Sequence, residues 1–240
     1  MLDLIGAVFG TAYYATLVGV LIGFPPLRAA TRVAAFAAAL AWLGVIVAVA
    51  AMGGLAPGAL GPVPATLLPF VGLLALLFGS WLLVPRFRDA LLALPLPVLV
   101  AVHACRLGGV FFLLLYGEGR LSAPFAPAAG VGDMITGGVA LILAALLALG
   151  FEVRRAWLGL WNAFGALDLV VAVALGALSA PGTPFRAFTE GPGTQAMTTL
   201  PWAFVPSLIV PILLLAHFTI AAKLRSSPRA RQAVAMAGRA

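Results

Sequence analysis

A small set of ionisable side chains interrupts the long apolar stretches of this 240-residue chain. The segment AVHACRLGG, residues 101–109, contains His103, Arg106 and the single cysteine, Cys105, within an otherwise apolar region. The second histidine, His217, and the carboxyl group of Asp168 lie within two further apolar stretches. An ionisable side chain in a bilayer is costly unless it is paired or hydrated, so each of these positions marks a functional site by default.

Helical spacing and depth restrict which of these side chains can meet. His103 and Arg106 are three residues apart and share a helix face. At a rise of about 1.5 Å per residue, His103 reaches a depth in the membrane close to that of Asp168 or of His217. Both pairings remain open at this stage.

Arg106 requires an anion if it lies within a membrane. Asp168, Asp133 and Glu118 are the candidates in the chain, and the last two are expected at the outer ends of their helices. A buried ion pair is one interpretation of Arg106. The other is a contact with an anionic ligand group, such as a carboxylate or a haem propionate.

Three further residues, Trp161, Asn162 and Tyr13, belong to the candidate site by position. Trp161, Gly165 and Asp168 form one stripe along a helical stretch, and the small residue allows close approach of a second helix or leaves room for a flat ligand. Asn162 lies near one end of the same stretch, and Tyr13 lies midway along the first apolar stretch.

Two interpretations of the site need no cofactor. In the favoured one, His103, Arg106, Asp168 and His217 line an intramembrane path that binds or translocates a small ligand or protons, with histidine as the proton switch. In the other, the protein is an accessory subunit whose polar residues only pair with one another. The composition leaves an oligomer or a partner subunit open.

Two alternatives require more specific chemistry. In a membrane b-type haem protein, His103 and His217 are the axial ligands and Arg106 pairs a propionate. In an intramembrane enzyme acting on a lipid or isoprenoid substrate, a carboxyl group supplies the acid or base. The candidates for that role are Glu118, Asp133 and Asp168. With two histidines and one cysteine, a multi-ligand iron or zinc site is not supported, and the cofactor stays unknown.

The composition shows what kind of protein must position these residues. The chain is 63% hydrophobic and 9% charged, with a mean hydropathy of +1.15, whereas soluble domains carry about 25% charged residues. We therefore predict an all-α integral membrane protein in the lipid bilayer. The net charge of +7 comes from basic residues that flank apolar stretches, so no nucleic-acid partner is expected.

Seven apolar stretches approach the length of about 20 residues that a membrane-spanning helix needs. We expect a seven-helix transmembrane domain over residues 1–225 and a short basic cytoplasmic tail over 226–240. The expected spans are 4–23, 30–53, 63–85, 91–116, 131–150, 157–180 and 198–223.

The distribution of basic residues predicts the orientation. If the N-terminus is outside and the C-terminus is cytoplasmic, only Arg120 and Arg186 fall in outer connections, and nearly all other basic residues fall inside. The compact chain with short loops suggests a bacterial inner membrane. The outer connections are rich in Gly and Pro yet apolar, so we expect them to fold onto the bundle, as connectors or as a lid over a cavity.

Prolines predict an irregular last helix. Pro206 and Pro211 each disturb the carbonyl four residues earlier, which belongs to Trp202 and Ser207, respectively. Because lipid offers no hydrogen bond, we expect this helix to face protein or a hydrated cavity at those carbonyls.

Overall fold

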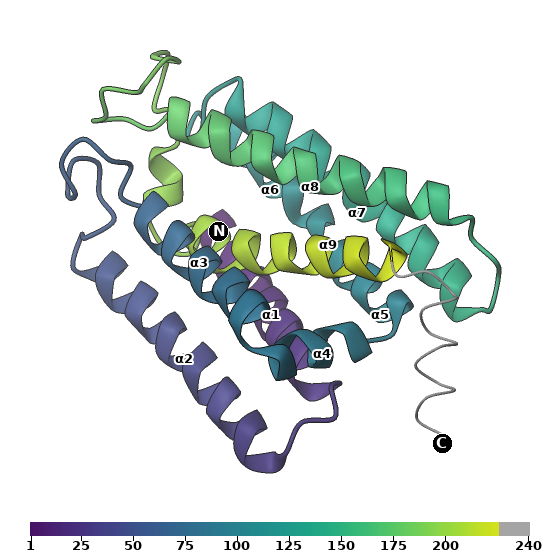
Figure 1. The fold of residues 1–240 in the computed structure, drawn as a ribbon. Coiled ribbons are helices and arrows are strands. Elements are labelled where there is room, and N and C mark those ends of the chain that lie inside the picture. Colours follow the sequence, from purple (N-terminus) through teal and green to yellow (C-terminus); the bar gives the residue numbers. More distant parts are fainter. Residues whose placement is uncertain (226–240) are drawn as a thin grey trace, which may run out of the picture.

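The computed structural model describes residues 1–225, which form helices and loops with no strand among them (Figure 1). The predicted tail, 226–240, lies outside the described residues. Within this described range, six helices are long and apolar enough to cross a membrane, or seven if a helix pair bent by 96° counts as one span. The prediction of an all-helical membrane protein is confirmed. The six are α1 (Leu2–Gly23), α2 (Ala29–Ala51), Leu96–Gly117, α7 (Phe125–Ala148), α8 (Arg155–Leu178) and Val205–Arg225.

The bent pair consists of α3 (Leu67–Leu83) and α4 (Pro85–Ala93). Residues 86–90 fall between the expected spans 63–85 and 91–116, but a helix begins at Pro85, since proline is well tolerated in a first helical turn. In α4, Arg86 is exposed and Leu91 is buried. A short helix with one basic and one apolar face is typical of a membrane interface.

The helix that carries Arg106 changes its winding in the middle. It consists of α5 (Leu96–Ala101), a 3₁₀ segment η1 (Val102–Gly109) and α6 (Val110–Gly117). His103 and Arg106 both lie buried in η1. A 3₁₀ stretch within a helix often marks a functional or strained position, and here it coincides with the candidate site.

Helix α7 begins earlier than expected, and this changes the position of Asp133. The Ala-, Pro- and Gly-rich residues before Asp133 were predicted to be loop, but α7 starts at Phe125. Pro127 falls in the first turn, where its missing N–H costs no helical hydrogen bond. Asp133 is therefore about 12 Å inside the helix at the usual rise per residue. The prediction that Asp133 lies at the outer end of its helix was wrong.

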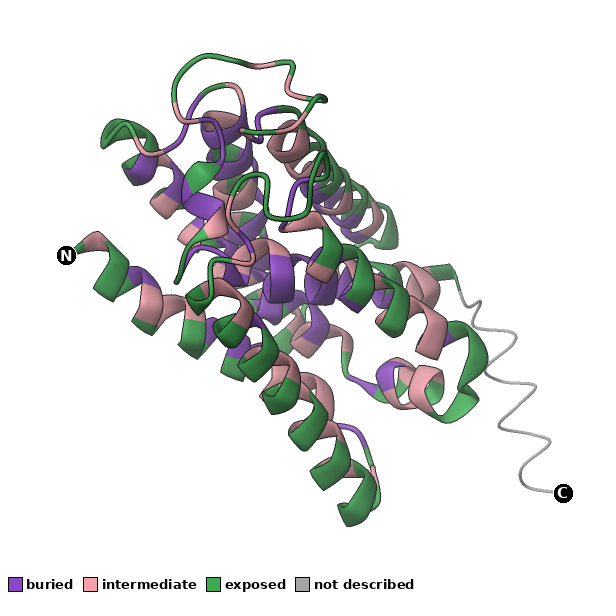
Figure 2. Cartoon of the chain, turned by 90° about the vertical axis from the view of Figure 1, so that its left-hand side faces the viewer, coloured by how far each residue is buried: buried purple, intermediate pink, exposed green. Residues whose placement is uncertain are grey.

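The last helix lies at the centre of the molecule. It consists of a π-helical segment η3 (Val205–Ile209) followed by α9 (Val210–Arg225). In an apolar stretch of 18 residues of this helix, 67% of the residues are buried, compared with 6% in the corresponding stretch of α2. Figure 2 shows buried residues toward the middle of the molecule and exposed ones along the outward faces of the long helices. Those outward faces carry large apolar side chains, as expected for contact with lipid.

Both carbonyls that the prolines disturb have partners. The Trp202 carbonyl accepts from the Val205 amide at 3.1 Å. The Ser207 carbonyl accepts from Nε1 of Trp42 at 3.3 Å. Trp202 and Ser207 are also buried in protein. The prediction that this helix faces protein there is confirmed.

Replacing Trp42 with phenylalanine should lower the free energy of unfolding by about 1 kcal/mol, because the Ser207 carbonyl then loses its side-chain partner in an apolar setting. Unfolding of the purified protein in detergent measures this. Trp157→Phe is the control, because Trp157 is exposed on the outer face of α8. An equal loss in the two variants would contradict the assigned role of Trp42.

Contacts between distant segments define the two ends of the bundle. Arg120 pairs with Asp3 at 2.8 Å, which brings the N-terminus beside the connection after α6. At the other end, Nζ of Lys223 donates to the Leu92 carbonyl at 2.6 Å. We call the end at the Arg120–Asp3 pair the loop end, and the end at Lys223 the basic end. The loop end comprises connections 52–66, 118–124 and 179–204, and the basic end comprises 24–28, 84–95 and 149–154.

The connections at the loop end fold onto the bundle, as the sequence predicted. Leu55, Ala65 and Met197 are buried although they lie outside the long helices. The guanidinium of Arg186 donates to backbone carbonyls of its own loop, including that of Gly191 at 2.7 Å. These connections therefore form an ordered cover over this end.

Candidate functional site

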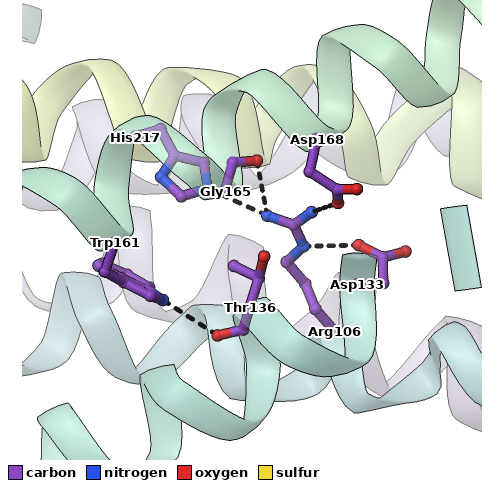
Figure 3. Close-up of polar contacts among 7 residues, drawn as sticks. All are labelled: Arg106, Asp133, Thr136, Trp161, Gly165, Asp168 and His217. Atoms are coloured by element: carbon purple, nitrogen blue, oxygen red, sulfur yellow. Dashed lines mark hydrogen bonds and ion pairs between the residues drawn. The ribbon is translucent and has the colours of Figure 1, made fainter. Parts of the chain in front are cut away.

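Arg106 is the centre of a buried polar cluster (Figure 3). Its Nε donates to Oδ1 of Asp133 at 2.6 Å, and one terminal nitrogen forms a short ion pair with Asp168. The other terminal nitrogen donates to the Gly165 carbonyl at 2.9 Å. The Arg106 side chain is only 1% exposed. Two of the three predicted carboxyl candidates thus pair with this arginine, from α7 and from α8.

Glu118, the third candidate, lies elsewhere. Helix α6 ends at Gly117, so Glu118 is in the exposed connection, 3.4 Å from Arg120. The hydrogen bond and charge of Asp3, with a smaller effect of Glu118, raise the pKa of the Arg120 guanidinium. The structure does not bring Glu118 to the buried cluster.

His217 joins the cluster through both ring nitrogens. Its Nε2 lies 3.1 Å from a terminal nitrogen of Arg106, and its Nδ1 lies 2.9 Å from Oδ1 of Asn162. The Asn162 side-chain amide also donates to the His217 carbonyl at 3.1 Å, which fixes which end of the amide faces the ring. Because guanidinium only donates, Nε2 must accept, and Nδ1 carries the proton. The contacts therefore assign a neutral His217 with the proton on Nδ1.

We predict that nitrogen-15 NMR of histidine-labelled protein will show His217 as the Nδ1–H tautomer. With only two histidines in the chain, His103→Gln assigns the remaining signal. In Asn162→Leu the Nδ1–H loses its acceptor, so the Nδ1 signal should shift, while Arg106 still donates to Nε2 and keeps the proton on Nδ1. An Nε2–H signal in the unaltered protein would contradict the assigned hydrogen bonds.

His103 stacks on His217, which decides between the two pairings left open by the sequence. The ring centroids are 3.9 Å apart with a tilt of 31°, and the Trp161 ring meets His103 edge-on at 5.5 Å. His103 is fully buried, and neither ring nitrogen has a hydrogen-bond partner within residues 1–225. Trp161 itself donates to the Thr136 carbonyl at 3.1 Å. Asp168 pairs with Arg106 and not with His103.

This arrangement does not fit haem ligation. A haem macrocycle lies between its two axial imidazoles, whereas these two rings contact each other directly. Both nitrogens of His217 are also engaged by protein groups. Among residues 1–225, no group of three or more His, Cys, Asp or Glu side chains could hold a metal ion.

Glycines allow the helices to approach closely around the cluster. A Cβ atom on Gly165 would lie 2.7 Å from the ring of His217, and one on Gly132 would overlap the Asp168 carboxyl group. A Cβ on Gly137 would lie 2.6 Å from the backbone nitrogen of Leu107. The sequence left open whether the small face of α8 accommodates a helix or a flat ligand, and here His217 occupies it.

Two small cavities approach the cluster from the loop end. One, of about 60 Å³, is lined by Tyr13, Cys105, Arg106 and Asp133 with apolar neighbours. The Tyr13 hydroxyl is buried and has no hydrogen-bond partner in the described chain. The second, of about 90 Å³, also includes Asp133 and reaches Thr194 in a loop-end connection. Asp133 is therefore shared between both cavities.

A larger groove approaches the cluster from the opposite side. It has a volume of about 770 Å³ and lies between α3, α8 and α9. Asn162 and His217 line it, and it extends to Leu224 and Arg225 near the basic end. Arg106 thus contacts Asp133, which borders both cavities, and His217, which borders the groove. The sequence could not indicate the Gly165 carbonyl as a ligand of Arg106, because backbone contacts leave no side-chain signal.

Comparison with known proteins gives one match. A family model described as "Domain of unknown function (DUF8737)" matches residues 63–225. This range includes every residue of the buried cluster, while α1 and α2 precede it. No curated protein and no solved structure matches the chain. The chain belongs to the family described as Domain of unknown function (DUF8737).

Proposed function

We propose that this membrane protein binds a proton at the Arg106 cluster and passes it between the two sides of the membrane. The observation that carries this proposal is an imbalance of charge. One guanidinium holds two carboxyl groups, and the side chains of Asp133 and Asp168 are only 16% and 11% exposed. An unbalanced buried charge is costly, so the cluster is expected to take up one proton or another cation.

The positions of the cavities support a path through the cluster. Asp133 borders the two cavities at the loop end, and His217 and Asn162 border the groove that extends toward the basic end. Between them, Arg106 contacts both Asp133 and His217. A proton that enters at the carboxyl groups therefore has a titratable acceptor nearby. This acceptor is His217, which contacts Arg106 on the side away from Asp133.

The same contacts couple proton binding to the position of Arg106. If His217 gains a proton on Nε2, a second cation faces the guanidinium across 3.1 Å, and the two groups repel each other. If a carboxyl group gains the proton, its charge-assisted hydrogen bond with Arg106 weakens. The arginine would then shift between its carboxyl and imidazole partners as the proton moves.

We also propose seven membrane crossings with the loop end outside and the basic end in the cytoplasm, in a bacterial inner membrane. Among the basic residues of 1–225, only Arg120 and Arg186 lie in the loop end. The other non-buried ones lie in the basic end or next to it, which is the asymmetry of a cytoplasmic face. A fluorescent protein fused to the C-terminus should fold and fluoresce in the cytoplasm. A dark fusion that is exported would contradict this orientation. The basic residues in the basic end, or in the helix turns next to it, are Arg28, Arg32, Arg86, Arg88, Arg154, Arg155, Lys223 and Arg225.

Proton flux into liposomes tests the proposed path. The purified protein is reconstituted with a pH-sensitive dye inside, and a potassium diffusion potential drives protons inward. We expect acidification faster than in protein-free vesicles, and its loss in His217→Leu. Arg120→Ala is the matched control, since it removes an exposed ion pair at the loop end. Equal rates for the unaltered protein, His217→Leu and empty vesicles would overturn the proposal and favour a structural ion-pair cluster.

A further inference from the structure

We infer that the cavity of about 90 Å³ beside Asp133 binds a small alkylammonium ion, which competes with the proton of the cluster. This inference rests on the proposed function, because both cations would neutralise the same excess charge. We call this site the aromatic cavity. Its lining includes Phe70 of α3, Phe112 of α6, and Phe125 and Asp133 of α7.

The lining has the chemistry of a site for an apolar cation. Phe70, Phe112 and Phe125 contribute aromatic rings, and most of the other side chains are aliphatic. Among the described residues of the lining, Asp133 is the one ionisable group, and no basic side chain accompanies it. Aromatic faces attract alkylammonium ions, and a carboxyl group adds charge complementarity. An anionic ligand would meet only the carboxyl group and apolar surface.

Asp133 has a free oxygen for such a ligand. Arg106 uses only Oδ1, and Oδ2 has no hydrogen-bond partner in the described part of the chain. Figure 3 shows the second carboxyl oxygen pointing away from the guanidinium. The side chain stays 16% exposed although the helix around it is packed, because the carboxyl group borders the cavities.

The size and access of the cavity restrict the ligand further. A cavity of about 150 Å³ holds one benzene ring, so the aromatic cavity, at about 90 Å³, suits an ion smaller than benzene, such as ethylammonium. Pro64 and Thr66 of one connection and Thr194 and Met197 of another also line it. The ligand would therefore enter at the loop end, beneath the two connections that fold over the bundle.

Competition follows from charge balance. A protonated cluster is neutral, so adding an alkylammonium ion should release the proton: the carboxylic O–H breaks, the carboxylate pairs with the bound ion, and H⁺ leaves to solvent. One ion bound corresponds to one proton released. Affinity should fall by up to about tenfold for each unit of lowered pH over the range in which the cluster is protonated.

Isothermal titration of the purified protein in detergent with ethylammonium chloride tests this inference. Two buffers with different ionisation heats report the number of protons released. We expect saturable binding with about one proton released per ion, and loss of binding in Asp133→Asn. Asp3→Asn is the matched control, because Asp3 is an exposed carboxylate at the same end.

A second variant and a second ligand keep the test decisive. Phe112→Leu keeps all charges but removes one aromatic face, and we expect affinity about three- to thirtyfold weaker. Ethanol, a neutral analogue of the same size as ethylammonium, should bind far more weakly than the cation. Absence of saturable binding, unchanged binding in Asp133→Asn, or equal binding of the neutral analogue would overturn the inference.

The outcomes also separate this inference from the proposed proton path. Proton flux without alkylammonium binding would overturn the inference and leave the path standing. Alkylammonium binding with no proton flux and no proton release would overturn the path and the competition, and leave only a cation site at Asp133.

Discussion

Replacing Arg106 with methionine is expected to lower the free energy of unfolding by about 3–5 kcal/mol. The substitution keeps the length of the side chain but leaves Asp133 and Asp168 without their shared cation, and it removes the donors to Gly165 and His217. Unfolding of the purified protein in detergent measures the loss. Arg120→Met is the control, for which we expect at most about 1 kcal/mol, because its partners are exposed.

The triple variant Arg106→Met, Asp133→Asn, Asp168→Asn separates charge from packing. It removes the unpaired carboxyl groups together with the guanidinium, so most of the lost stability should return. If Arg106→Met alone is as stable as the unaltered protein, the buried cluster does not hold the charges that the contacts indicate.

The second large effect is expected at Gly137. A Cβ atom there would lie 2.6 Å from the Leu107 nitrogen and 3.0 Å from the carbonyl carbon of Arg106. These are backbone atoms, so α7 and η1 must move apart to relieve the overlap. We expect Gly137→Ala to cost about 1–3 kcal/mol in unfolding free energy. Because the movement also displaces Arg106, proton flux in liposomes should fall as well.

The neighbouring residue supplies the matched control. Gly138 lies on the same helix, and a Cβ there meets nothing within 4 Å. Gly138→Ala should therefore change stability by no more than about 1 kcal/mol, in the direction set by helix propensity. Similar losses for Gly137→Ala and Gly138→Ala would show that close contact between α7 and η1 is not required.

Apolar length predicted the helices where the chain stays regular. The expected spans 4–23, 30–53 and 157–180 agree closely with α1, α2 and α8. The predicted helix boundaries were wrong where a segment rich in proline and glycine can form a helix as well as a loop. Pro127 fits a first turn, so α7 extends to Phe125 and carries Asp133 into the bundle.

The identity of the site residues was more predictable than their partners. Buried ionisable residues stand out in an apolar sequence, which indicated Arg106, Asp168 and both histidines. Their pairing depends on which helices are neighbours, and hydropathy does not encode neighbours. The stack of His103 on His217 and the contact of Arg106 with the Gly165 carbonyl therefore required the structure.

An infrared pH titration of the protein in lipid detects the proposed proton itself, because the C=O stretch of a carboxylic acid reports protonation. We expect one protonated carboxyl group per chain near neutral pH, where exposed carboxyl groups are ionised, and we expect its proton to exchange with solvent. Its band should disappear in both Asp133→Asn and Asp168→Asn, since either change leaves one carboxylate balanced by Arg106. Two carboxylates that stay ionised at every pH at which the protein is folded, or a band that persists in both variants, would show that the Arg106 cluster does not bind a proton.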